Sequence, residues 1–227
     1  MSVIVNPSIF KFLTALNENN TREWFAKNKD YYLKEDAKIK EFFTSINEKL
    51  SAIDNIAGMK AYRIYRDIRF SKDKTPYKIY RSCSYKRATG ALRGGYHLEI
   101  TPGGSFLAAG FWQPNKEDLF RIRKEFEMDS SYIEKILSDK KFTKLFEGFH
   151  NRNSLKVAPT GFDKNHPNID LIRKKDFIVL RKFTDKEVLS KDFHTTIINS
   201  FKAVRPFFNY MSDVLTTNLN GESILEE

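Results

Sequence analysis

The chain changes its pattern at Tyr62-Arg-Ile-Tyr-Arg66-Asp-Ile-Arg-Phe70. Apolar or aromatic residues at 62, 64, 68 and 70 lie on one side of this stretch in an extended conformation, and mostly polar residues lie on the other. A period of two is typical of a β-strand. Upstream of the stretch the apolar residues recur at helical spacing, and downstream short apolar runs are separated by turn residues. The stretch therefore predicts the first strand of a sheet, placed after N-terminal helices.

The remaining pattern predicts the other elements of the fold. Helical spacing and capping residues indicate helices over 7–16, 20–58 and 115–127, another after Ser130, and a last one from 192 that bends or ends before Pro206. Apolar runs indicate strands near 79–85, 96–100, 105–112 and 177–180, with a turn at Thr101-Pro-Gly-Gly104. We predict an α+β fold, with a central, mostly antiparallel curved sheet flanked by N- and C-terminal helices.

Length and composition favour one globular domain. The 227 residues contain no Pro-, Gly- or Ser-rich linker and 41% of them are hydrophobic, so we expect a single domain over 1–227 with a frayed tail at 219–227. Neither a secretory signal nor a membrane-spanning run is visible, and a lone cysteine, Cys83, agrees with a reducing compartment. We expect a cytoplasmic protein without membrane contact or cofactor, and its oligomeric state stays open.

Almost all of the net charge lies in one segment. The formal charge of the chain is +10, and residues 60–93 contain eleven basic and two acidic residues, a net charge of +9. A positive field of this density attracts phosphates, nucleic acids or acidic substrates. We therefore expect a binding site in this segment.

The same segment carries a resemblance to a known family. Its spacing R-x-x-R-D-x-R-F, followed closely by D-K-x-x-Y, resembles the hallmark of the domain-of-unknown-function 2461 family of bacterial and fungal proteins. The matching residues are Arg63, Arg66, Asp67, Arg69, Phe70, Asp73, Lys74 and Tyr77. The likeness extends to Asn20-Thr-Arg-Glu-Trp-Phe25, the Pro102-Gly-Gly turn with Trp112, Pro159-x-Gly161-Phe162-Asp163 and His166-Pro167. The resemblance implies no particular activity.

Three interpretations of the basic segment remain open. On a strand, Asp67 can accept bidentate hydrogen bonds from an arginine on its own face. Arg66 lies on the apolar face, where an unpaired guanidinium is costly, so a carboxylate such as Glu23 or Glu99, or a bound anion, should meet it. The segment is a structural network, a set of catalytic residues, or an anion-binding pocket, and we favour for the pocket the lining Arg63, Arg66, Asp67, Arg69, Lys74, Tyr77 and Lys78.

Other chemistry-bearing residues are secondary candidates. His97 and Glu99 share a strand face and could exchange a proton or begin a metal site, but two ligands are too few to predict a metal, and an ordinary strand face explains them too. Asp163 and His166 lie in a loop, where they serve either acid–base chemistry or loop order. Cys83 is expected to be a buried strand cysteine. Standard nucleotide-binding glycine motifs are absent from the sequence.

Three functions are compatible with these features. The favoured one is a pocket protein or enzyme that recognises a small phosphate- or carboxylate-bearing ligand through clustered Arg and Lys. The first alternative is an RNA or single-stranded DNA binding module, since tyrosines and Phe70 interleave with the basic residues and could stack on bases. The second alternative is a structural domain that binds a partner protein. Whether the chain is an enzyme is left open.

Overall fold

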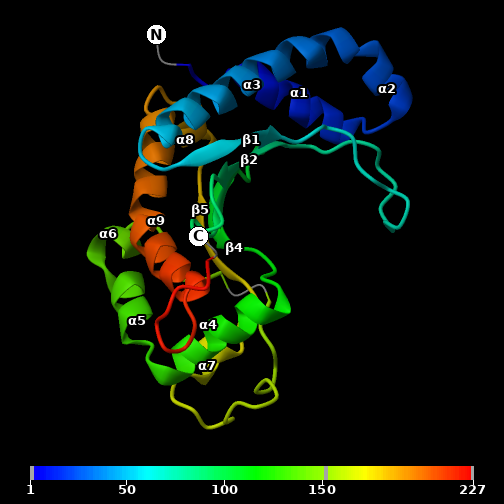
Figure 1. The fold of residues 1–227 in the computed structure, drawn as a ribbon. Helices are drawn as coiled ribbons and strands as arrows, with labels where there is room; N and C mark the ends of the chain where they lie inside the picture. The colour runs from blue at the N-terminus through cyan, green and yellow to red at the C-terminus, as the bar shows by residue number, and fades with distance from the viewer. Residues whose placement is uncertain (1–2, 151–152, 226–227) are drawn as a thin grey trace. The chain divides into compact units, whose positions relative to one another are not determined.

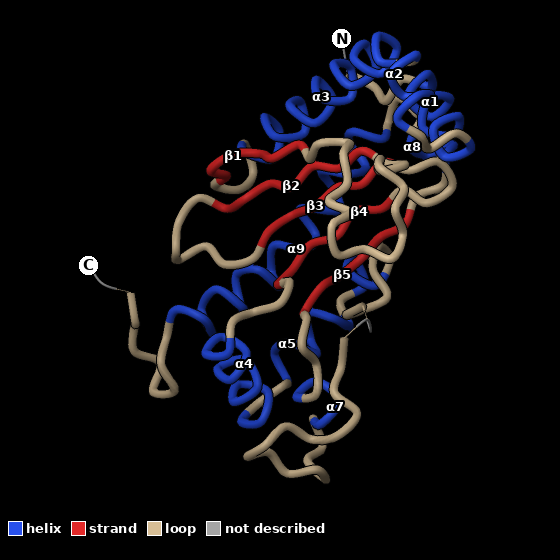
Figure 2. Tube along the Cα trace, turned by 90° about the vertical axis from the view of Figure 1, so that its right-hand side faces the viewer, coloured by secondary structure: helices blue, strands red, loops and turns tan. Residues whose placement is uncertain are grey.

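The computed structural model describes residues 3–150 and 153–225. Five strands lie side by side in the order β1-β2-β3-β4-β5 and form an open antiparallel sheet (Figure 2). The strands are β1 (Ile56–Ala61), β2 (Arg81–Arg87), β3 (Gly95–Ile100), β4 (Phe106–Phe111) and β5 (Phe177–Lys182). The helices are α1 (Pro7–Glu18), α2 (Arg22–Lys27), α3 (Lys29–Ser51), α4 (Lys116–Met128), α5 (Ser131–Ser138), α6 (Lys140–Thr143), α7 (Ile169–Ile172), α8 (Asp185–Val188) and α9 (Phe193–Thr216). The predicted α+β class with N- and C-terminal helices is confirmed.

Internal contacts divide the chain into two compact units. The first unit comprises the described residues up to 85 with 97–107 and 182–199, and the second comprises 86–96, the described part of 108–181, and the chain from 200 onward. This is a division of internal contacts, and the single domain expected over 1–227 stays a prediction.

In the first unit, α1 and α3 pack together and α3 covers β1 (Figure 1). The predicted helix over 20–58 is wrong in two respects, its continuity and its end. Asn28 ends α2 and begins α3, and α2 is capped by Thr21, whose hydroxyl accepts a hydrogen bond from the Trp24 N–H at 3.2 Å. The chain is already in β1 by Ile56, because the apolar stripe of α3 ends at the buried Leu50.

The second unit is built around aromatic packing. Tyr96 on β3 lies against Phe201 and Phe208 of α9, with ring centroids 4.7 and 4.9 Å apart. Of the bend or end predicted before Pro206, the end is wrong, because α9 continues through it. Proline removes one backbone hydrogen bond of a helix, and burial of Phe207 and Phe208 directly after it holds the helix in register.

The capping residues explain why α4 begins where the sequence predicts. The Asn115 side chain accepts a hydrogen bond from the Asp118 N–H at 2.7 Å, which satisfies a free donor of the first turn. In the tail that was expected to be frayed, Thr217 pairs with Ser223 in an isolated bridge, while residues 226–227 lie outside the described part. No helix in 3–150 or 153–225 is both long and apolar enough to cross a membrane.

Candidate functional site

The basic segment forms a hairpin-like loop, residues 62–80, between β1 and β2 (Figure 1). Tyr65 and Tyr77 form an isolated antiparallel bridge, and flanking backbone hydrogen bonds of 2.8 and 2.9 Å close the loop. All of 62–70 is described and none of it is a regular strand, so the predicted strand is wrong. The period-two pattern does not correspond to one buried side of a strand, since Phe70, expected on the same side as Ile64, is 96% exposed. We call residues 62–80 the hairpin.

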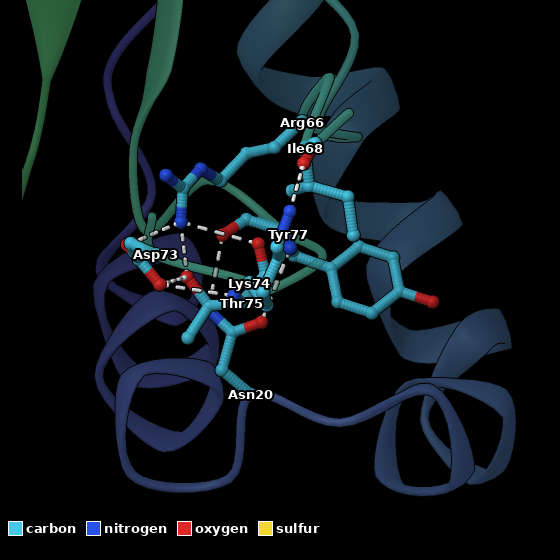
Figure 3. A network of polar contacts seen from close by, with 7 residues as sticks. All are labelled: Asn20, Arg66, Ile68, Asp73, Lys74, Thr75 and Tyr77. Carbon is cyan, nitrogen blue, oxygen red and sulfur yellow. Dashed lines mark hydrogen bonds and ion pairs between the residues drawn. The ribbon is translucent and has the colours of Figure 1, made fainter. Parts of the chain in front are cut away.

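Arg66 has its partners inside the hairpin (Figure 3). Its Nη1 donates to the Asp73 carboxylate at 2.5 Å, to the Thr75 carbonyl at 3.1 Å and to the Thr75 hydroxyl. Hydrogen bonds from the Thr75 N–H and hydroxyl, followed by that from Arg66, lower the pKa of Asp73 to about 2. A partner for Arg66 was correctly expected, but its identity as Glu23 or Glu99 was wrong.

The expected bidentate pair of Asp67 is confirmed. Arg69 donates from Nε at 3.0 Å and from Nη2 at 2.7 Å to the two Asp67 oxygens, and this lowers the pKa of Asp67. The Lys74 ammonium donates to the Ile68 carbonyl at 2.9 Å (Figure 3). These donors of Arg69 and Lys74 serve contacts within the hairpin, so a role for either residue in ligand binding stays a prediction.

Tyr77 anchors the hairpin to the N-terminal helices. Its backbone N–H donates to the Asn20 side-chain oxygen at 3.1 Å, and the Asn20 amide donates to its carbonyl at 3.0 Å. Its ring stacks on Phe25 with centroids 4.0 Å apart, and burial raises the pKa of its hydroxyl. In Figure 3 that hydroxyl points away from Arg66, so the two side chains do not converge, and a role for Tyr77 in ligand binding stays a prediction.

Beside the base of the hairpin, polar side chains gather on the face of β2 and β3 opposite the buried Leu98. We call this group the Lys78 site. It consists of Tyr62, Lys78, Tyr80, Ser84, His97 and Glu99, all of them half-buried. Its members come from the hairpin and from two strands of the first unit. The fold therefore brings Lys78, one of the residues predicted to bind an anion, beside the secondary candidates His97 and Glu99.

Lys78 lies at the centre of this site. Its ammonium is 5.4 Å from the ring centroid of Tyr62 and 5.7 Å from that of Tyr80. Burial, followed by the charges of Arg81 and Arg63, lowers the pKa of Lys78, while Glu99 acts in the opposite direction. No carboxylate oxygen within the described chain lies within 4.0 Å of this ammonium. Lys78 is therefore a half-buried cation to which the described residues bring no counter-ion into contact.

A short chain of polar groups adjoins Lys78. The Nδ1 of His97 is 2.9 Å from the Ser84 hydroxyl, and that hydroxyl is 3.2 Å from the Tyr62 hydroxyl. Burial, then the charge of Lys78, lowers the pKa of His97, whereas burial raises the pKa of Glu99. All three ionisable groups are thus shifted towards their neutral forms, which is frequent at functional sites.

The remaining candidates have ordinary structural contacts. Asp163 accepts a hydrogen bond from the Asn165 N–H at 2.9 Å, and His166 Nδ1 accepts one from the Asn168 N–H at 3.1 Å. Both residues thus order their loop, which belongs to the second unit. Cys83 is fully buried in β2, as expected, and burial raises its pKa to about 11. Among the described residues, no three of His, Cys, Asp and Glu are grouped as a metal site.

Sequence reasoning missed three members of the Lys78 site. Tyr62 and Tyr80 were predicted as strand or stacking residues, and Ser84 was assigned no role. The period-two pattern of β3 identifies the face of His97 but not the partner strand opposite it. The contact of Ser84 with His97 depends on the pairing of β2 with β3, for which no local signal exists in the sequence.

Comparison with known proteins gives a family and no more. A family model described as conserved hypothetical protein (DUF2461) matches residues 8–210. No curated protein matches the chain, and no solved structure does. The match includes both the hairpin and the strands that carry the Lys78 site.

Proposed function

The chain belongs to the family of conserved hypothetical proteins DUF2461, a description that names no activity, and from the geometry we propose that it binds a small phosphate- or carboxylate-bearing ligand at the Lys78 site. One observation carries this proposal. The Lys78 ammonium is half-buried between two tyrosine rings and has no carboxylate in contact with it in the described chain.

Other buried or half-buried cations of the first unit are neutralised within the fold. Arg81 lies 2.5 Å from Asp36, and Arg66 lies 2.5 Å from Asp73. Removing an ammonium from water without a partner is unfavourable, and the lowered pKa of Lys78 reflects that cost. An anion in contact with Lys78 would offset this cost and restore the charged form.

The neighbours of Lys78 supply suitable hydrogen bonds for such an anion. In either neutral tautomer of His97 the three groups leave one donor for the anion: the Nε2–H when Nε2 carries the proton, or one of the Tyr62 and Ser84 hydroxyls when Nδ1 carries it. The charge of Arg63 adds to the positive field, since it contributes to the lowered pKa of Lys78. Glu99 opposes a dianion when ionised, and its raised pKa lets it accept a proton as the ligand enters. These properties favour a small, singly charged or partly protonated ligand.

The test is a thermal-shift titration with inorganic phosphate and with succinate, each compared with sodium chloride at equal ionic strength. The wild-type protein should be stabilised by at least one of the two anions, and Lys78→Met should lose that response. Lys60→Met is the matched control, because Lys60 also faces the Tyr62 ring, at 5.5 Å, but is exposed. Its response should equal that of the wild type.

A second readout locates the anion. The chain has four histidines, so their ring proton signals can be assigned by substitution and followed in an NMR titration. A bound anion should raise the pKa of His97 and leave that of His166, in the second unit, unchanged. If neither anion moves the His97 titration, or if Lys78→Met responds as the wild type does, the proposal is wrong.

A further inference from the structure

The far end of the hairpin presents an aromatic ring to solvent. We call residues 68–74 the hairpin tip. Phe70 is 96% exposed, and its ring packs on no other aromatic ring of the described chain. The Arg69 guanidinium lies 6.0 Å from the ring centroid, and its side chain is itself 77% exposed. The tip therefore displays an apolar ring among cationic groups.

The backbone around this ring is held in place by polar contacts. Lys74 spans the tip through its bond to the Ile68 carbonyl, and Arg69 is fixed on Asp67 through two bonds. Asp73 accepts from the Thr75 N–H at 2.9 Å and joins this side of the loop to Arg66. Phe70 is thus presented by an ordered loop, although its own ring buries no apolar area.

An exposed aromatic side chain on a loop held by hydrogen bonds suits binding to a partner, because little backbone conformational freedom is lost when the partner arrives. The charge of the hairpin indicates which partner. Residues 63–78 contain six Lys or Arg and two Asp, and both Asp carboxylates are paired with arginines of the hairpin. The surface that remains is cationic, with Lys72 and Lys74 exposed beside Phe70.

From this juxtaposition we propose that the hairpin tip binds single-stranded nucleic acid, with Phe70 stacked on an unpaired base and Arg63, Lys72 and Lys74 near the phosphates. A single strand offers both the anionic backbone and a free base face, whereas the bases of a duplex are already stacked on one another. The tyrosines expected to help are mostly unavailable: Tyr77 and Tyr85 are buried, and Tyr65 is 46% exposed against 96% for Phe70. The interaction is therefore centred on one ring.

The test uses fluorescence anisotropy with labelled oligothymidylate and oligouridylate of equal length. Phe70→Ala should weaken binding by roughly tenfold or more, the usual effect of losing one stacked base. Phe120→Ala is the matched control, because Phe120 is an exposed phenylalanine of α4 in the second unit. It should leave binding unchanged. Thermal melting of Phe70→Ala should match the wild type, since the ring is not buried.

Two further measurements separate stacking from simple charge attraction. Phe70→Trp should retain binding, and its added indole emission should be quenched by either oligonucleotide as bases stack on it. Lys72→Gln should reduce the slope of log affinity against log salt by about 0.7, the value for one phosphate contact on a single strand. Preference for the thymidylate or the uridylate then distinguishes DNA from RNA.

Several outcomes would overturn the proposal. It is wrong if neither oligonucleotide binds at low salt, or if Phe70→Ala binds as well as the wild type. It is also wrong if Phe70→Ala loses binding to phosphatidylglycerol vesicles while oligonucleotide binding is unaffected, because the tip would then be a lipid-binding element. The anion response of the Lys78 site uses other variants, so either proposal can fail without the other.

Discussion

Asp36→Ala should destabilise the first unit more than any exposed substitution in α3. Asp36 is 7% exposed and joins two cations of very different burial. Its Oδ1 is 2.5 Å from Nη2 of Arg81, which is 1% exposed, and its Oδ2 is 2.7 Å from the ammonium of Lys40, which is 53% exposed. Arg81 also donates to the Tyr62 carbonyl at 2.5 Å, at the start of the hairpin. The substitution removes the carboxylate and leaves the buried guanidinium without it.

The two partners allow the magnitude to be worked out. Leaving one charge of a buried pair uncompensated costs about 3–5 kcal/mol of unfolding free energy. Losing an exposed pair costs about 1 kcal/mol or less. We therefore expect Asp36→Ala to lose about 3–5 kcal/mol and Lys40→Ala to lose no more than about 1 kcal/mol. The double variant Asp36→Leu with Arg81→Met should recover part of the loss, because no unpaired charge stays buried.

Urea unfolding followed by tryptophan fluorescence measures these differences. Trp24 lies in the first unit and Trp112 in the second, so variants that keep one tryptophan report on each unit. With a slope of about 2–3 kcal/mol per molar urea, Asp36→Ala should lower the midpoint seen by Trp24 by roughly 1–2 M. A shift no larger than that of Lys40→Ala would refute the reasoning, since the buried pair would then stabilise the fold no more than an exposed one.

Three smaller predictions follow from other contacts. Asn20→Ala removes both side-chain hydrogen bonds to the Tyr77 backbone, at 3.0 and 3.1 Å, and should cost about 1–3 kcal/mol, with faster amide exchange at Tyr77. Gly110→Ala should lose more than about 4 kcal/mol of unfolding free energy or fail to fold, because its Cβ would lie 2.1 Å from a β5 carbonyl oxygen. Gly58→Ala, whose Cβ would meet no heavy atom within 4 Å, should lose much less unfolding free energy in the same urea assay. Burial lowers the pKa of His97 below that of the unfolded chain, so stability should fall as pH drops through about 6.5, where only the unfolded chain gains the proton. His97→Gln should flatten that fall between urea midpoints measured on either side of this pH, and an unchanged slope would contradict the assignment.

Local signals predicted most of the fold. Asn115, the turn at 101–104 and the apolar run at 177–180 all indicated element ends close to those observed. The failures are non-local. The alternation at 62–70 is that of a strand, but a strand needs a neighbour along its length, and here the pairing is confined to the Tyr65–Tyr77 bridge and a few backbone hydrogen bonds around it. Pro206 indicated a bend or an end of the helix, and tertiary burial of its neighbours prevents the end.

The candidate site was predictable in part for the same reason. Alternation along β3 placed His97 and Glu99 on one face, and the charge count identified the segment that supplies Lys78. The sequence could not show that Arg66 would pair with Asp73, seven residues away, because that contact depends on how the hairpin closes. Nor could it show that Tyr77 would turn its hydroxyl away from Arg66 (Figure 3).

The structure also changes the meaning of the charge concentrated in residues 60–93. A net charge of +9 suggests a broad attractive surface, but Arg66, Arg69 and Arg81 are each joined to a carboxylate. Their charges stabilise the hairpin and its attachment to α3, so they contribute less to the outer field than the count implies. Lys78 has no counter-ion in contact within the described chain, and Phe70 is 96% exposed. Internal packing explains the paired arginines and leaves these two side chains unexplained, which is why a ligand and a partner are proposed at those two positions.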